Sequence, residues 1–182
     1  MRLHASSATR RILAAAAVTC AAALAPAAAL AAPGQHADGA RTAIPACATS
    51  GLDVWLDTNG DSALGHTEYQ LKFTNLSGST CTLLGYPGVS AVTLTGTQIG
   101  SAAVRSGTTP QTVTLANGAT THAVVEITNT GLFQPSLCHQ VTAAGLKVYP
   151  PNQTKSRTVP FPFGACSKTG TIYLAISPVG FP

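Results

Sequence analysis

The residues best suited to chemistry lie in one short acidic segment, residues 57–68. Four oxygen-bearing side chains occupy positions 1, 3, 5 and 12 of a calcium-loop pattern: Asp57, Asn59, Asp61 and Glu68. Position 6, where that loop needs glycine for a sharp turn, is Ser62, and the flanking residues alternate as strands do instead of forming helices. The segment therefore predicts a polar hairpin loop, with weak calcium binding as the alternative.

Other reactive side chains form no catalytic arrangement in the sequence. The histidines after the N-terminal segment fall in separate stretches, without a metal-binding spacing: His36, His66, His122 and His139. No serine stands in the G-x-S-x-G motif of hydrolases. We therefore expect no enzymatic activity, no cofactor and no metal centre.

Four cysteines remain after an N-terminal leader that carries Cys20, and they are Cys47, Cys81, Cys138 and Cys166. An even number in an exported chain predicts two disulfides, whereas spacings of 34, 57 and 28 residues match no zinc finger. Of the three pairings, we favour Cys47–Cys81 with Cys138–Cys166, because each closes a local loop within one half of the chain.

The leader has the features of a secretory signal peptide. Arg2, Arg10 and Arg11 precede the uncharged, alanine-rich run 12–30, which ends in the small-x-small sequence of a cleavage site. A membrane anchor is the rival interpretation, but polyalanine is weakly hydrophobic and Pro26 interrupts it. We expect a signal peptide over 1–31, a flexible linker over 32–46, a folded domain over 47–180 and no stable membrane insertion after cleavage.

The charge of the mature chain argues against nucleic acid as a partner. The full chain has ten basic and six acidic residues and a formal net charge of +4. Three basic residues leave with the signal peptide, so seven remain against six acidic ones. Nucleic-acid binding needs a surplus of positive charge, which this balance does not supply.

Period-two alternation and turn residues indicate the elements that must position these groups. Strands are predicted over 52–57, 69–74, 81–84, 89–94, 146–149 and 171–177, and over 111–116 and 119–128 as a hairpin about Asn117-Gly118. Residues 141–145 favour a helical turn or a loop. About eight short strands predict an all-β fold, an immunoglobulin-like antiparallel β-sandwich.

Four aromatic residues beside prolines are the candidates for a binding rim: Tyr86, Tyr149, Phe161 and Phe163. If these side chains gather at one end of the sandwich they form a ligand-binding surface. The alternative is that they cap the core where turns leave it.

Two segments resemble a known family. Residues 65–75 (GHTEYQLKFTN) and 81–90 (CTLLGYPGVS), with Cys138, the 148–151 run VYPP and Cys166 in order, resemble the domain-of-unknown-function 4232 family of exported actinobacterial proteins. One departure is Asn117, where proline is expected before the glycine. The resemblance implies an immunoglobulin-like sandwich with the four cysteines as its pattern, and it implies no activity.

These observations predict a secreted, non-catalytic module at the cell envelope or outside the cell. Its partner is expected to be a protein or a glycan, bound by loops at one end of the sandwich. The alternative is an extracellular inhibitor of a secreted enzyme, with the loops 101–111 and 150–163 as the inhibitory segments.

Overall fold

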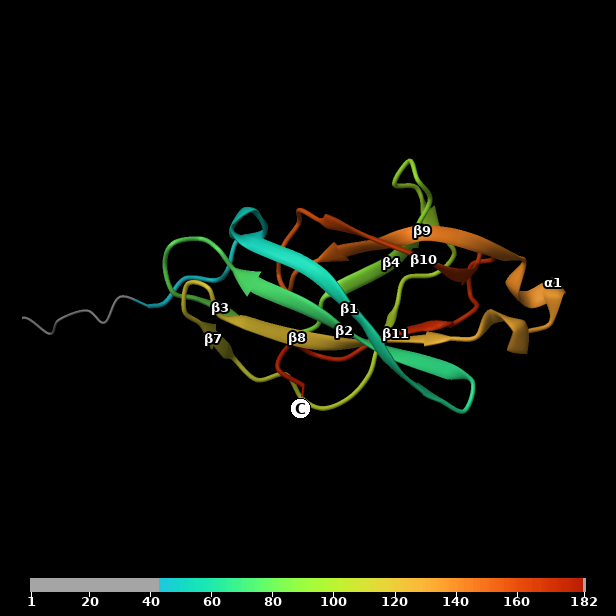
Figure 1. Ribbon diagram of the computed structural model, residues 1–182, viewed down its shortest axis with the longest axis horizontal. Helices are drawn as coiled ribbons and strands as arrows, with labels where there is room; N and C mark the ends of the chain where they lie inside the picture. Colours follow the sequence, from blue (N-terminus) through green and yellow to red (C-terminus); the bar gives the residue numbers. More distant parts are fainter. Residues whose placement is uncertain (1–42, 182) are drawn as a thin grey trace, which may run out of the picture. The chain divides into compact units, whose positions relative to one another are not determined.

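Alternating apolar side chains give the domain its strands, and the computed structural model describes them for residues 43–181 (Figure 1). The expected signal peptide and most of the expected linker lie outside the described residues. The strands are β1 (Leu52–Ala63), β2 (His66–Asn75), β3 (Cys81–Leu83), β4 (Gly88–Val92), β5 (Gln98–Ile99), β6 (Val104–Arg105), β7 (Val113–Leu115), β8 (Thr120–Thr128), β9 (Gln140–Tyr149), β10 (Arg157–Cys166) and β11 (Leu174–Ile176). The short helices are η1 (Thr49–Gly51), η2 (Thr130–Leu132) and α1 (Pro135–Cys138).

The strands form two larger sheets and one small one. The first sheet has the order β1-β2-β8-β11-β6, the second has the order β10-β9-β4-β5, and β3 pairs with β7. Every pairing is antiparallel except that of β11 with β6. The prediction of an all-β fold with two disulfides is confirmed. The structure has eleven strands instead of about eight. Two of the additional strands, β5 and β6, are too short to leave a periodic pattern in the sequence, and the third, β10, lies in a segment whose prolines predicted a loop.

The core is built from the inner faces of both larger sheets. Fully buried side chains from the first sheet include Leu71, Phe73 and Val125, and those from the second include Val89, Leu146 and Val148. In β2 and β8 these residues alternate with more exposed neighbours, as expected for a sheet covered on one face, whereas residues 89–92 of β4 are all buried. Burial of these apolar surfaces is the main force that holds the two sheets together.

Both predicted disulfides are confirmed. Cys47 bonds to Cys81, and so joins the segment before η1 to β3, with Cα atoms 4.9 Å apart. Cys138 at the end of α1 bonds to Cys166 at the end of β10, with Cα atoms 4.5 Å apart. The second bond therefore fixes α1 to the last residue of β10.

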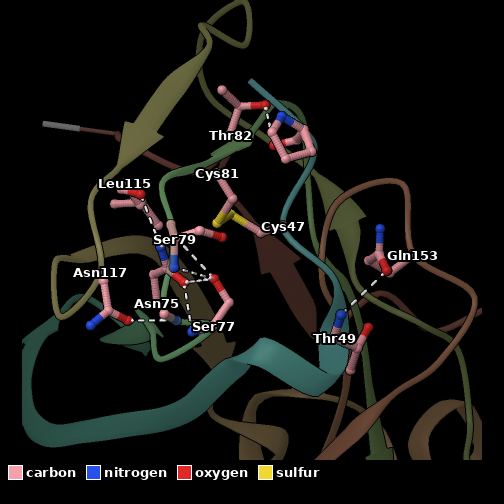
Figure 2. The surroundings of a disulfide bond; sticks show 12 residues. Cys47, Thr49, Asn75, Ser77, Ser79, Cys81, Thr82, Leu115, Asn117 and Gln153 are labelled. Carbon is pink, nitrogen blue, oxygen red and sulfur yellow. Dashed lines mark hydrogen bonds between the residues drawn. A yellow bond between two sulfur atoms is a disulfide. The ribbon is translucent and has the colours of Figure 1, made fainter. Parts of the chain in front are cut away.

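Around the first disulfide, Asn75 connects three segments (Figure 2). Its side chain is 0% exposed, and its Nδ2 donates to the carbonyl oxygens of Ser79 at 2.8 Å and Leu115 at 2.9 Å. Its Oδ1 accepts from the backbone N–H of Ser77 at 3.0 Å and from the Ser77 hydroxyl at 2.8 Å. The amide therefore joins the end of β2 to the 77–79 turn and to β7.

The predicted hairpin about Asn117-Gly118 is wrong, although the turn itself is present. The Ala119 N–H donates to Ala116 at 3.0 Å, but β7 pairs with β3 and β8 pairs with β2 and β11. The turn lies against the end of β2 instead, because the Asn117 Oδ1 accepts from Gly78 and the Gly118 N–H donates to Asn75. These hydrogen bonds hold the turn against residues distant in sequence, and the two strands that flank it, β7 and β8, belong to different sheets.

Two further boundaries differ from the expected ones. Residues 141–145 are part of β9 instead of a helical turn or loop, and Ala143 there is fully buried. Residues at the end of the expected linker already belong to the fold, because Ala46 forms a parallel bridge with Thr82 and the Thr82 N–H donates to Pro45 at 2.9 Å.

The outer edges of both sheets are poorly suited to pairing with another strand. On β1 the register shifts between Asp57 and Asp61, and edge strand β10 carries Pro160 and Pro162, which have no N–H to donate. At the opposite edges, β5 and β6 are two residues long. Bulges, prolines and short edges are the features that prevent edge-to-edge association.

Candidate functional site

A cavity of about 460 Å³ opens at the end of the sandwich that carries α1. We call this end, with η2, α1 and the Leu64–Gly65 turn, the α1 end (Figure 1). The cavity is lined by residues of both larger sheets and of η2: Ser62, Ala63, Gly65, His66, Thr67, Tyr69, Ile127, Thr128, Asn129, Thr130, Gln140, Phe161, Phe163 and Gly164. Its volume lies in the range of small-molecule sites, about 300–1,000 Å³.

The bulge in β1 positions the first aromatic ring of the cavity. Gly60 lies within this bulge, and a Cβ atom there would come 2.5 Å from Cε1 of Tyr69 and 2.8 Å from Cγ2 of Thr67. No side chain larger than hydrogen fits between them. Glycine at this position therefore lets the Tyr69 ring lie against β1.

A bulge in β10 positions the other two rings. Between Pro160 and Phe163 the strand has one more residue than the facing stretch of β9. The Phe161 ring lies edge-on to Tyr69 with centroids 4.9 Å apart, and it stacks with Phe163 at 5.9 Å and an interplanar angle of 27°. All three rings are half-buried, so they pack on the core and also line the cavity.

Neutral polar groups complete the cavity around η2. Asn129 caps η2, since its Oδ1 accepts from the Gly131 N–H at 2.9 Å, and its own N–H donates to Gly65 at 2.7 Å. A Cβ at Gly164 would come 2.8 Å from Thr130 Oγ1 and 3.4 Å from Gln140 Nε2. Glycine at position 164 thus lets these two side chains pack closely against β10.

Beside the cavity, three potential metal-ligating side chains meet on the outer face of the first sheet. Among the described residues, His66, Glu68 and Glu126 bring their ligand atoms within 4.8 Å of one another. Glu68 lies directly opposite Glu126 on neighbouring strands, and the His66 Nε2 lies 3.8 Å from Glu68 Oε1. One imidazole and two carboxylates are ligand types that divalent transition metals accept.

The predicted calcium ligands lie on paired strands instead of in a loop. Asp57, Asn59 and Asp61 are in β1 and Glu68 is in β2, with Asp61 directly opposite Glu68. Asp57 Oδ1 accepts from the backbone N–H of Asn59 at 3.1 Å and from its Nδ2 at 3.0 Å, an Asx-type turn within the bulge. The expected polar hairpin is present, its turn lies at 64–65, and calcium binding stays a prediction.

Acidic side chains gather on one surface of the domain. All five acidic residues of the part that the structure describes lie on the outer face of β1, β2 and β8: Asp53, Asp57, Asp61, Glu68 and Glu126. Each of these residues alternates along its strand with side chains that face the core, or lies opposite another outward-facing residue on the neighbouring strand. This surface would repel a phosphate backbone.

Two titratable side chains have shifted pKa values. Burial, and then the charge of Lys72 on the neighbouring strand, lower the pKa of His122 below its usual value of 6.5. Burial raises the pKa of Tyr173 to about 12. The Tyr173 hydroxyl donates to the carbonyl oxygen of Ile99 at 3.2 Å, and its side chain is 1% exposed.

The predicted aromatic rim is only partly formed. Phe161 and Phe163 meet at the cavity, whereas the Tyr86 hydroxyl donates to Thr108 at 2.9 Å in a different region and the Tyr86 ring lies under Arg105, 5.5 Å from its guanidinium carbon. Sequence reasoning missed Tyr69 because its alternation with polar neighbours predicts a core residue. Gly60 gave no signal either, because it lies in the polar segment that was predicted to be a loop.

The two segments expected to be inhibitory loops contain strands. Residues 157–163 belong to β10 and residues 104–105 form β6. Two exposed apolar side chains lie at the α1 end, where Leu64 is 103% and Leu132 is 66% exposed. A Cβ at Gly65 would come 2.6 Å from Leu132, so the two leucines flank one turn beside the cavity.

Over residues 43–181, the helices are too short and too polar to cross a membrane.

Comparison with known proteins identifies the family. Neither the curated proteins nor the solved structures contain a match to this chain. A family model described as a domain of unknown function, DUF4232, matches residues 47–179. This match begins at the first disulfide cysteine and ends at the buried Val179, so it covers nearly all of the described fold. The chain therefore belongs to the DUF4232 family.

Proposed function

We propose that this protein is a secreted, non-catalytic binding module of the extracellular space or cell envelope, and that its ligand enters the cavity at the α1 end. The observation that carries the proposal is the composition of this cavity. Three aromatic rings and a set of neutral hydrogen-bonding side chains converge on one space of about 460 Å³. Ligand sites combine apolar and aromatic surface with placed polar groups, and this cavity presents both, with the polar groups in the majority.

The cavity is built on strands and lies beside a disulfide, which favours binding. Tyr69, Phe161 and Phe163 are held by strands, and the Cys138–Cys166 bond lies next to Gln140 and Gly164. Side chains that are already ordered lose little conformational entropy when a ligand arrives. A preformed cavity therefore supports a binding role.

The chemistry of the lining supports a non-catalytic role. Within the described lining, His66 is the one histidine, and its Nε2 lies 3.8 Å from Oε1 of Glu68. The Ser62 hydroxyl shares a hydrogen bond with the Thr67 hydroxyl at 3.1 Å, and not with a general base. The four described cysteines are in disulfides and hold no free thiolate.

Export is supported by the two disulfides. Such bonds form and persist in oxidising compartments and are rare in the cytosol. The acidic outer face of β1, β2 and β8 further supports a partner other than nucleic acid. The partner is a protein or a glycan that the secreted domain meets outside the cell.

Co-sedimentation of the oxidised protein with purified cell-envelope fractions tests this function. The test compares wild-type protein with Phe163→Leu, which removes one ring of the cavity, and with Tyr86→Leu, a matched change away from it. We expect wild-type and Tyr86→Leu proteins to be retained and Phe163→Leu to remain in the supernatant. Equal retention of all three, or retention of none, would overturn the proposal.

A further inference from the structure

We infer that the ligand of the α1-end cavity is a neutral sugar residue of a glycan. This inference rests on the proposed function and names the class of ligand. It is drawn from three properties of the cavity: its lack of charged lining groups, its aromatic surface, and the blocked sheet edges beside it.

The lining argues against an ionic ligand. Apart from His66, the polar side chains that line the cavity are hydroxyls and amides: Ser62, Thr67, Tyr69, Thr128, Asn129, Thr130 and Gln140. A phosphate or carboxylate group is usually held by arginine or lysine, and neither lines this space. An organic cation would need carboxylates, and none lines the space either.

The lining instead matches a molecule with an apolar face and a rim of hydroxyls. A pyranose ring has this form, because its C–H bonds present an apolar face while its hydroxyls point outward around the ring. The half-buried pair Phe161 and Phe163, stacked at 5.9 Å, offers an apolar aromatic surface for the C–H face. Gln140 and Asn129 carry amide groups, which can both donate and accept hydrogen bonds with hydroxyls.

Local geometry leaves the amide of Gln140 accessible. Thr130 is buried against Gly164, where a Cβ atom would come 2.8 Å from its Oγ1, so this hydroxyl packs against the protein. Gln140 is an exposed residue at the first position of β9, two residues after Cys138 of the disulfide. A ligand hydroxyl can therefore reach this amide without displacing the backbone.

A peptide ligand fits less well. Peptides commonly bind to sheet proteins by adding a strand to an edge, and the two edges that border the cavity are unsuited to this. Edge strand β1 has a bulge at 57–61, and edge strand β10 has prolines at 160 and 162. The exposed Leu64 and Leu132 give a peptide some apolar contact, and so a peptide is an outcome that the test must detect.

The test uses envelope fractions divided into three portions: untreated, protease-treated, and treated with periodate, which cleaves sugars at vicinal diols. The oxidised full-length exported protein is added to each, with Gln140→Ala and Phe163→Leu as cavity variants. The matched controls, Gln153→Ala and Tyr86→Leu, remove a glutamine amide and an aromatic ring outside the cavity lining.

We expect retention to survive protease and to be lost after periodate. Titration with soluble neutral oligosaccharides (gluco-, manno-, galacto- and arabino-configured) is expected to find at least one that binds, and each cavity variant to weaken it about tenfold. If the cavity-dependent retention resists periodate but is lost after protease, the sugar inference is overturned. The proposed binding function would then still stand. Absence of cavity-dependent retention in every portion would overturn both.

Discussion

Replacing Asn75 by alanine is expected to destabilise the domain by about 2–4 kcal/mol. The Leu115 carbonyl would lose its buried bond from the Asn75 Nδ2, and a buried polar group without a partner costs about 1–3 kcal/mol. The three bonds with Ser77 and Ser79 lie nearer the surface, where water replaces part of what is lost, so together they add about 1 kcal/mol. Against a typical stability of about 5–15 kcal/mol, this loss is easily measured.

Urea unfolding followed by circular dichroism measures this loss, with Asn117→Ala as the matched control. Asn117 has the same side chain but accepts one exposed bond, from Gly78 at 2.9 Å, so its removal is expected to cost less than about 1 kcal/mol. Asn75→Asp keeps the acceptor but places a carboxylate oxygen against the Leu115 carbonyl, and so it should lose at least as much as Asn75→Ala. Similar midpoints for the Asn75 and Asn117 variants would refute the reasoning.

Three further predictions concern the disulfides and the shifted side chains. Replacing both Cys138 and Cys166 by alanine opens a loop of 28 residues and should cost about 3–4 kcal/mol in urea unfolding, and a loss below about 1 kcal/mol would contradict this. Tyr173→Phe strands the Ile99 carbonyl and should cost about 1–3 kcal/mol, which an unchanged thermal midpoint would disprove. Because the pKa of His122 is lowered in the folded state, the unfolded chain takes up its proton first, so this residue should reduce stability as pH falls below 6.5. That dependence should weaken in His122→Gln, and identical pH profiles for both proteins would rule it out.

The strands and disulfides could be predicted because their signals are local. Leu52, Val54 and Leu56 alternate with polar residues, as do Leu71 and Phe73, and these strands lie where the pattern indicates. The pairing of Cys47 with Cys81 followed from the preference for short loops. Period and spacing can be read directly from the sequence, and neither depends on distant residues.

The features that could not be predicted depend on tertiary contacts. The Asn117-Gly118 turn has the local chemistry of a hairpin, yet bonds to Gly78 and Asn75 draw its flanking strands into different sheets. Likewise, the parallel pairing of β11 with β6 leaves no local pattern. Local residue preferences determine that a turn forms at Asn117-Gly118. Contacts with residues far along the chain determine which strands pair on either side of it.

The cavity escaped sequence analysis for the same reason. Phe161 and Phe163 were candidates, but the ring that completes their group, Tyr69, is about ninety positions earlier in the chain. Two bulges bring these strands into place, one with two extra residues in β1 and one with a single extra residue in β10, and neither has a fixed sequence signature. Gly60 and Gly164 mark the close approaches only once the fold is known.

The most direct test of a binding site at the α1 end is amide chemical-shift mapping by NMR. The ¹⁵N-labelled oxidised protein is titrated with the soluble glycans released from purified envelope. Progressive shifts centred on Tyr69, Gln140 and 161–164, with 84–86 and 150–156 unchanged, are the predicted result. Shifts confined to 84–86 and 150–156, or no shifts at saturating glycan, would contradict the account.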